Sequence, residues 1–181
     1  MNDIEKQLFA DTASASDNDG GRMRRVSECA VELVPGRECG NCTMCCKLIE
    51  VREIAKPRNQ WCKHCTPKKG CGIYQDRPPT CREWYCGWRT LRFLSDAWFP
   101  AKCGMVVNPV LGANGGKTNL LDVHIDPWKA RGWQEHEGLR KLARVGLEMS
   151  TPAFTTQVTI GEDHWLMLPD GPRGPRKAHS T

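Results

Sequence analysis

The chain has 181 residues, of which 39% are hydrophobic and 26% are charged, and its formal net charge is +5. This composition is typical of one soluble globular domain with tails. It excludes a membrane-spanning protein, because no apolar run approaches the roughly 20 residues that cross a bilayer. The N-terminus has no apolar segment of signal-peptide length, so we expect a cytoplasmic protein.

The most unusual feature of the composition is its 11 cysteines. In a reducing compartment such a density indicates a metal or redox site rather than a set of disulfides, and the odd number argues against complete pairing. Nine of them lie between Cys39 and Cys86. Cys29 and Cys103 stand alone and are typical of small core residues.

The charges are unevenly distributed along the chain. Residues 1–20 hold five acidic residues and one lysine, whereas residues 29–103 hold 13 basic and 7 acidic residues, a balance of +6. Two divalent ions with four thiolates each would add about −4 to that segment. The basic residues therefore compensate for thiolates, and we do not expect a nucleic-acid partner.

The domain organisation follows from these composition changes. Residues 1–28 are small, polar and acidic, and we expect a disordered arm. One cysteine-cluster domain should span 29–168, with a metal knuckle at 39–94 and a sheet-and-helix part at 104–168. Residues 169–181 are rich in proline, glycine and basic residues and predict a second disordered tail.

The first cysteine element is Cys39-Gly-Asn-Cys42-Thr-Met-Cys45-Cys46. Thiols spaced by three residues can converge from a tight loop or a helical turn. Cys45 and Cys46 are adjacent, and neighbouring side chains diverge by about 100° on a helix. One of this pair can therefore join Cys39 and Cys42, while the other faces a second centre or packs in the core.

The second element combines Cys62-Lys-His64-Cys65 with Cys71, which lies between two glycines. A CxxC pair alone could be a thioredoxin-like dithiol. The Thr-Pro-Lys-Lys-Gly that follows, however, does not fit the strand-to-helix junction of that motif. We leave His64 out of the ligand set, because a single histidine among so many thiols is more often an outer-sphere or exposed residue.

The third element is Arg77-Pro-Pro-Thr-Cys81-Arg82-Glu-Trp-Tyr-Cys86. The prolines predict an extended segment, and Cys81 and Cys86 follow on a predicted helix that continues to Leu94. Arg77 and Arg82 flank the thiols, where they either donate hydrogen bonds to sulfur or form surface ion pairs.

Beyond the cysteines, alternating hydrophobic residues predict strands at 104–110 and 119–126, separated by an Asn-Gly-Gly turn. An apolar face predicts an amphipathic helix over 135–149, and residues 155–161 and 164–168 predict a hairpin. The predicted fold class is α+β. A small metal-stabilised, cysteine-rich knuckle is packed with a short antiparallel sheet and one or two helices.

One polar pattern outside the cysteines needs an interpretation. Asp122, His124 and Asp126 share one face of the second predicted strand, because strand side chains alternate. They could bind a catalytic metal, but we favour the wet side of an edge strand, with Val123 and Ile125 facing the core. The sequence has no P-loop and no Gly-x-Ser-x-Gly, so an enzymatic function would rest on a cysteine-bound metal alone.

Together the three cysteine elements resemble the YkgJ-like cysteine-cluster family, which is described as a zinc- or iron-chelating domain with a CxxCxxCC signature. The matching segments are CGNCTMCCKLIEV, WCKHC and GCGIYQDRPPTCREWYCGW. The resemblance implies seven metal-ligand positions: Cys39, Cys42, Cys45, Cys46, Cys71, Cys81 and Cys86. The family often has a single cysteine before the Cys-x-Ile-Tyr step, where this chain has Cys62 and Cys65, so either of these two is the eighth candidate.

Cysteine-only ligation suits tetrahedral zinc and iron–sulfur clusters alike. The ferredoxin pattern has three residues between its third and fourth cysteines, whereas here Cys46 follows Cys45 directly. A block with so little aliphatic core also needs the roughly 10 kcal/mol that structural zinc contributes to folding. We therefore expect zinc, as two ions, with iron or an iron–sulfur cluster as the alternative.

The predicted function is that of a metal-binding protein, chelating zinc or iron, with a structural or metal-handling role. The alternative is an iron–sulfur redox protein, an oxidoreductase. The expected partners are metal ions, and no membrane or nucleic acid is expected.

Overall fold

The computed structural model of the chain describes residues 32–112, 118–148 and 154–177. The predicted acidic arm at 1–28 and Cys29 lie outside these residues. Along the described chain the elements are α2 (Met44–Leu48), η2 (Arg52–Ile54), β1 (Cys65–Thr66), β2 (Gly70–Cys71), α3 (Pro79–Glu83), α4 (Gly87–Thr90), η3 (Asp96–Trp98), α5 (Pro100–Cys103), β3 (Met105–Gly112), β4 (Thr118–Ile125), η4 (Pro127–Lys129), η5 (Trp133–Glu135), α7 (Glu137–Glu148), β5 (Phe154–Ile160), β6 (Asp163–Leu168) and β7 (Gly171–Lys177).

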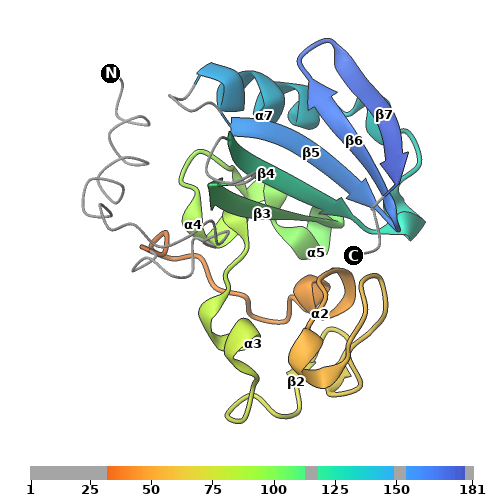
Figure 1. The fold of residues 1–181 in the computed structure, drawn as a ribbon. Helices are drawn as coiled ribbons and strands as arrows, with labels where there is room; N and C mark the ends of the chain where they lie inside the picture. Colours follow the sequence, from red (N-terminus) through yellow and green to blue (C-terminus); the bar gives the residue numbers. More distant parts are fainter. Residues whose placement is uncertain (1–31, 113–117, 149–153, 178–181) are drawn as a thin grey trace.

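The second half of the chain forms a five-stranded sheet in the order β3-β4-β5-β6-β7 (Figure 1). Neighbouring strands are antiparallel except for β4 and β5, which are parallel. The parallel pair arises because α7 lies between these two strands in the chain, and a crossover of this length returns the chain in the same direction. The predicted α+β class is confirmed, but the sheet is mixed rather than wholly antiparallel.

Helix α7 covers one face of the sheet, against β5 and β6 (Figure 1). Its buried residues Leu139, Leu142, Ala143 and Gly146 recur at helical spacing, which confirms the amphipathic helix predicted over 135–149. The helix approaches β5 closely at Gly146, where a Cβ atom would lie 2.9 Å from the carbonyl oxygen of Phe154. Only glycine leaves room for this contact.

The main hydrophobic core lies between α7 and this face of the sheet. Alternate residues of the strands supply it, and the segment after α4 adds two leucines. The buried residues of this core include Leu91, Leu94, Met105, Val107, Leu121, Val123, Ile125, Phe154, Val158 and Met167. The four predicted strands are confirmed, and no end differs from its predicted position by more than two residues.

The predicted disordered tail at 169–181 is wrong for most of its length. Residues Gly171–Lys177 form β7, which pairs with β6 at the edge of the sheet. The proline-rich composition misled the prediction, because an edge strand tolerates prolines that an interior strand does not. Pairing with β6 gives this segment backbone hydrogen-bond partners that its sequence does not reveal.

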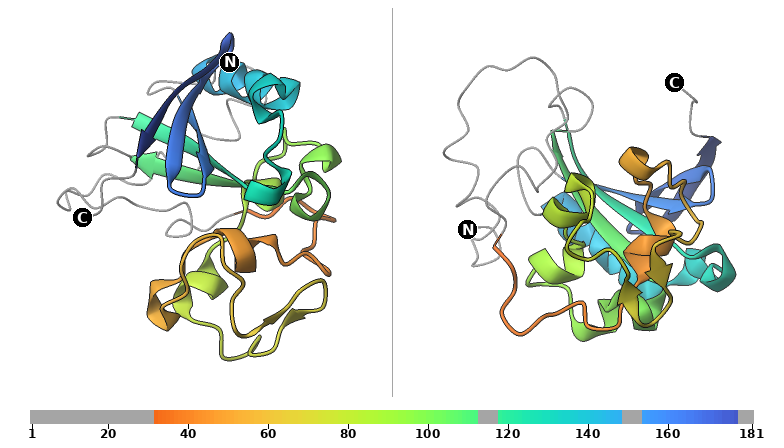
Figure 2. Two further views of the ribbon diagram at one scale, coloured as in Figure 1. Left: turned by 90° about the vertical axis from the view of Figure 1, so that its right-hand side faces the viewer. Right: turned by 90° about the horizontal axis from the view of Figure 1, so that it is seen from below.

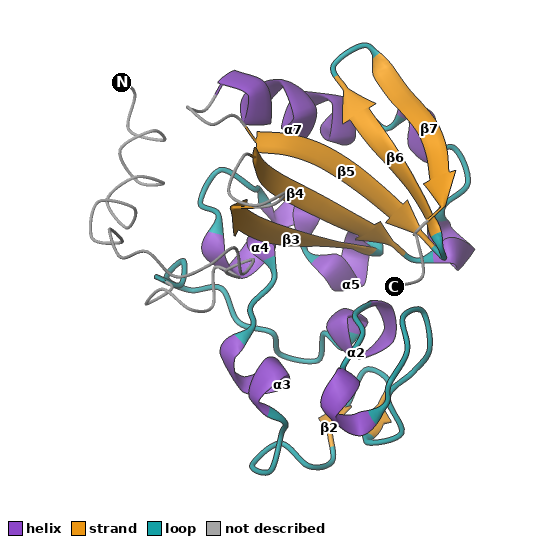
Figure 3. Ribbon diagram, viewed as in Figure 1, coloured by secondary structure: helices purple, strands orange, loops and turns teal. Residues whose placement is uncertain are grey.

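The cysteine-rich segment forms a separate layer beside the sheet, and this layer lies below the sheet in Figure 1 and in the left view of Figure 2. Loops make up most of this layer, and α2, η2, α3 and the short β1–β2 pair are its regular elements (Figure 3). We call residues 39–86 the cysteine block. Leu48 and Val51 are its buried hydrophobic side chains, so the block has almost no apolar core of its own.

The single helix predicted to run through Cys81 and Cys86 to Leu94 is wrong. Helix α3 ends at Glu83 and α4 begins at Gly87, and the backbone between them is extended. Two anchors hold this break in place. Trp84 Nε1 donates a 2.8 Å hydrogen bond to Asn108 Oδ1 on β3, and Gly87 packs against Val107 on the other side of the same strand.

In the part of the chain that the structure describes, no helix has both the length and the apolar character needed to span a bilayer.

Candidate metal centre

A cavity of about 740 Å³ lies inside the cysteine block. Eight of the nine candidate cysteines line it, and Val106 of β3 forms part of its wall. The lining cysteines are Cys39, Cys42, Cys45, Cys46, Cys62, Cys71, Cys81 and Cys86. The ninth, Cys65, is outside the lining but its thiol hydrogen-bonds to Cys46. The fold thus gathers three distant sequence elements around one cavity.

The first cysteine element is shaped by a tight turn and a short helix. The backbone N–H of Cys42 donates to the carbonyl of Cys39 at 2.8 Å, and Gly40 within this turn has a φ of +51°. Cys45 and Cys46 follow within α2. Consecutive residues of a helix start about 100° apart, but the thiol of Cys45 hydrogen-bonds to that of Cys46, so the two thiols do not point apart as the sequence predicted.

The second element is a small hairpin that is attached to α2. The backbone N–H of Cys62 donates to the carbonyl of Cys46 at 2.9 Å, so this chain segment lies directly against the first element. Strands β1 and β2 then pair Cys65 with Cys71 across the hairpin. The sequence predicted neither this pairing nor the proximity of Cys65 to Cys46.

The third element brings Cys81 and Cys86 to the cavity on either side of the break between α3 and α4. Arg77 holds this element together, since its guanidinium donates to the carbonyls of Tyr74 and Cys81 at 2.9 and 3.2 Å. It also lies over the Tyr74 ring, 3.7 Å from the centroid. Arg77 therefore bonds to backbone rather than to sulfur.

The arginine that does approach a sulfur atom is Arg89, which the sequence analysis missed. Its Nη1 lies 3.6 Å from Cys39 Sγ, and its guanidinium faces the Tyr85 ring at 5.5 Å. Arg89 falls three residues after Cys86, in α4. No sequence signal pairs it with Cys39, because the two residues are 50 positions apart.

The pKa of each thiol reflects its neighbours, and, apart from Cys46, which raises the pKa of both Cys42 and Cys45, these neighbours divide the cysteines into two groups. The pKa of Cys86 is raised to about 11, mainly by burial and in smaller part by the nearby Cys39 and Cys42. The pKa of Cys45 is raised by its hydrogen bond to Cys46, by burial and by Cys39 and Cys42. We call Cys39, Cys42, Cys45 and Cys86 the first thiol group.

The second thiol group comprises Cys46, Cys62, Cys65, Cys71 and Cys81. Burial raises the pKa of Cys65 to about 12 and that of Cys81 to about 11, and in both cases Cys46, Cys62 and Cys71 add to the rise. The adjacent pair Cys45–Cys46 thus contributes one thiol to each group. That the vicinal pair serves two neighbouring centres stays a prediction.

Cys46 differs from the other thiols, because its pKa is lowered to about 6. The hydrogen bond from Cys45 lowers it most, and the thiol of Cys65 and the positive charges of Lys56 and Arg77 lower it further. The thiol of Cys46 therefore ionises more readily than an ordinary cysteine thiol. It lies at the junction of the two groups.

The thiols surround the cavity without closing on a common point. Among the described residues, no three or more Cys, His, Asp or Glu side chains stand in an arrangement that could hold a metal ion. The donor chemistry nevertheless fits zinc or iron, because each group supplies at least four sulfur atoms. Binding an ion would draw the thiols of a group inward.

Two further residues belong to this region. Lys56 is only 5% exposed, and Cys46, Cys62, Cys45 and Cys81 all face its ammonium group. Cys103, which the sequence analysis set aside, lies close enough to Cys42 for that cysteine to raise its pKa, although burial raises it more. Neither residue belongs to a recognisable motif, so only the fold reveals them.

The polar side chains on β4 are not the wet side of an edge strand, and that prediction is wrong. Strand β4 is interior to the sheet, and Asp122, His124 and Asp126 are 8%, 6% and 5% exposed. The other half of the prediction is confirmed, since Val123 and Ile125 lie in the core. The polar face is buried because the cysteine block packs over this side of the sheet.

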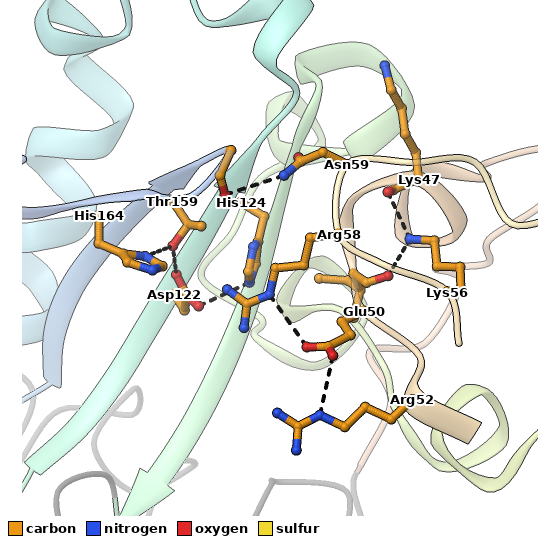
Figure 4. A network of polar contacts seen from close by, with 12 residues as sticks. Lys47, Glu50, Arg52, Lys56, Arg58, Asn59, Asp122, His124, Thr159 and His164 are labelled. Atoms are coloured by element: carbon orange, nitrogen blue, oxygen red, sulfur yellow. Dashed lines mark hydrogen bonds and ion pairs between the residues drawn. The ribbon is translucent and has the colours of Figure 1, made fainter. Parts of the chain in front are cut away.

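A chain of hydrogen bonds crosses this buried face (Figure 4). Asp122 Oδ2 lies 3.0 Å from His124 Nε2, and Asp122 Oδ1 accepts a 2.7 Å bond from Thr159 Oγ1, which lies 2.9 Å from His164 Nδ1. Burial by itself would raise the pKa of Asp122. The adjacent His124 and the hydrogen bonds from His124, Thr159 and Gln157 outweigh burial and lower it. The carboxylate is therefore ionised and fully paired.

One ion pair joins the cysteine block to the sheet. Lys47 Nζ of α2 lies 2.8 and 2.7 Å from the two carboxylate oxygens of Asp126, at the end of β4. The same carboxylate accepts a bond from the backbone N–H of Trp128. Asn59 adds a longer bond to the carbonyl of Gly161. These contacts fix the block against the sheet.

Comparison with known proteins gives no match to a family model, to a curated protein or to a solved structure. The resemblance to the YkgJ-like cysteine-cluster family therefore stays a prediction that rests on the three cysteine elements.

Proposed function

We propose that this chain is a metal-binding protein in which the two thiol groups each hold one ion, with zinc as the expected metal. The observation that carries the proposal is the convergence of eight cysteines, from three separate segments, around one cavity, with the ninth, Cys65, hydrogen-bonded to Cys46. Their division into groups of four and five gives each ion a full tetrahedral set of sulfur donors.

The weak core of the cysteine block supports a structural contribution from the metal. Leu48 and Val51 are the buried hydrophobic residues of a 48-residue segment, too few to offset the entropy of ordering its loops. Structural zinc contributes on the order of 10 kcal/mol in small domains of this kind. When bound, the ion would supply this stabilisation and ionise the thiols that hold it.

The buried lysine and the arginines of the block support the same proposal. Four thiolates and one divalent ion leave a net charge of −2. Lys56 and Arg77 lie beside the second thiol group and Arg89 beside the first. These cations balance charge that exists only when the thiols are ionised, as metal binding requires.

Elemental analysis of protein purified without oxygen tests the proposal. About two zinc ions per chain and a colourless solution are expected, and a chelator should unfold the cysteine block. A brown protein that absorbs visible light and contains iron would refute zinc as the metal and support an iron–sulfur cluster instead. A folded protein that holds no metal and ignores the chelator would contradict metal binding altogether.

Cys42→Ser and Cys29→Ser provide a matched pair of variants. Cys42 belongs to the first thiol group, so its replacement should remove about one ion per chain. Cys29 lies outside the cysteine block, and its replacement should leave the metal content unchanged. Equal metal loss in both variants would refute the ligand assignment.

A further inference from the structure

Lys56 presents a buried ammonium group at the C-terminal end of α2. Its Nζ donates to the carbonyl of Lys47 at 2.8 Å and also to the carbonyl of Ile49, while the residue is only 5% exposed. Carbonyl oxygens at the end of a helix attract a cation but carry only partial charge. A buried ammonium normally needs a full negative counter-charge.

No carboxylate supplies that counter-charge. In residues 32–112, 118–148 and 154–177, Lys56 forms no ion pair with an aspartate or a glutamate. The groups that face its ammonium are thiols, and those of Cys46, Cys62 and Cys81 belong to the second thiol group. As metal-bound thiolates, they would be its counter-ions.

The local backbone is bent to place Lys56 in this position. Val51 and Lys56 exchange backbone hydrogen bonds of 2.9 and 3.0 Å across a short loop. Ala55, immediately before Lys56, has a φ of +49° and a ψ of +38°. This left-handed conformation is rare for residues other than glycine and asparagine, and such outliers persist where the surrounding structure enforces them.

The first thiol group has a different character. Its member Cys39 is exposed to solvent, and the cation beside it, Arg89, reaches the sulfur from α4 at 3.6 Å. An exposed thiolate is open to a competing ligand, and displacement of one accessible ligand is how an ion leaves a thiolate site. The second group has no exposed member among its five cysteines.

From this asymmetry we infer that the two thiol groups have separate roles in metal handling. The second group, with Lys56 as its internal counter-charge, retains its ion, whereas the first group exchanges its ion through Cys39. Lys56 acts as a positioning residue, because it acts on the metal through the thiolates and never touches the ion. This inference rests on the proposed metal-binding function.

A chelator titration of the full-length, zinc-loaded chain tests the inference, with released zinc measured by an indicator dye. The wild-type protein should release two ions in two separate steps. Cys39→Ser should remove the first step and leave the second unchanged. Lys56→Met should move the second step to roughly ten- to a hundredfold lower chelator concentration, the usual effect of losing a residue that supports metal ligands.

Two controls separate the buried charge from other effects of substitution. Lys63 is exposed and directly follows Cys62, so Lys63→Met removes the same charge from the surface and should shift neither step. Lys56→Gln keeps a hydrogen-bond donor but no charge, and it should move the second step in the same direction as Lys56→Met.

Three results would overturn the inference. They are release of both ions in one step by the wild-type protein, equal effects of Lys56→Met and Lys63→Met, and an effect of Lys56→Met on the first step alone. A wild-type protein that binds no zinc would instead contradict the proposed function, so the two failures are distinguishable.

Discussion

Breaking the ion pair between Lys47 and Asp126 should destabilise the folded state, because it would leave one buried charge unpaired. Their side chains are 11% and 8% exposed, and the ammonium bonds both carboxylate oxygens. Asp126→Asn removes the negative charge but keeps the oxygen that accepts the Trp128 N–H. Because an unpaired ammonium would stay buried, we expect a loss of about 3 kcal/mol, the lower end for a broken buried pair.

A double-mutant cycle isolates the pair from its surroundings. Lys47→Met also removes the contact of the ammonium with the Trp61 ring, 5.7 Å away, but that loss is the same in both backgrounds and cancels. The doubly substituted protein buries no unpaired charge, so it should be more stable than the sum of the single changes predicts, by roughly 2 kcal/mol.

Equilibrium urea unfolding, followed by tryptophan fluorescence and circular dichroism, measures the four proteins. The zinc content of each must be equal, because Lys47 follows Cys46 directly and a lost ion would obscure the comparison. A cost below about 0.5 kcal/mol for Asp126→Asn, or additive single changes, would refute the view that this pair anchors the cysteine block to the sheet.

Three further predictions concern the sheet. The pKa of Asp122 is lower in the folded protein than its ordinary value of 3.8, so ionised Asp122 contributes its full stabilisation above pH 3.8 and loses it as the pH falls through the folded pKa. The free energy of unfolding of Asp122→Asn, measured across acid pH, should not show this decrease. Gly146→Ala should cost roughly 1–3 kcal/mol in urea unfolding, because its Cβ would meet the Phe154 carbonyl at 2.9 Å, and a stabilised variant would contradict that contact. Trp84→Phe should cost about 1 kcal/mol by leaving Asn108 Oδ1 without its donor, and the double variant with Asn108→Ala should show coupling.

Much of the fold could be predicted from local patterns in the sequence. The helix over 135–149 and four of the strands have hydrophobic periodicity that belongs to each segment alone, and the structure places them within one or two residues of their predicted ends. The parallel pairing of β4 with β5 and the presence of β7 could not be predicted from the sequence. They depend on which strand edges meet, and that is a property of the whole sheet.

The same distinction applies to the polar residues of β4. Alternation correctly put Asp122 and His124 on the face opposite Val123, because that follows from strand geometry alone. Whether that face meets water depended on the cysteine block, which is remote in sequence and packs over it. A polar face beneath another layer must satisfy its hydrogen bonds internally, as Asp122 does.

The sequence by itself determined that nine cysteines, in three spaced elements, form the candidate centre, because CxxC-like spacing and the density of thiols are local features. It also placed Cys45 and Cys46 side by side in one element, although the hydrogen bond between their thiols is visible only in the structure. Only the tertiary structure decided which thiols become neighbours across the hairpin and the α3–α4 break. It alone placed Lys56 and Arg89 beside them, because contacts between distant residues depend on the path of the whole chain and leave no pattern in its sequence.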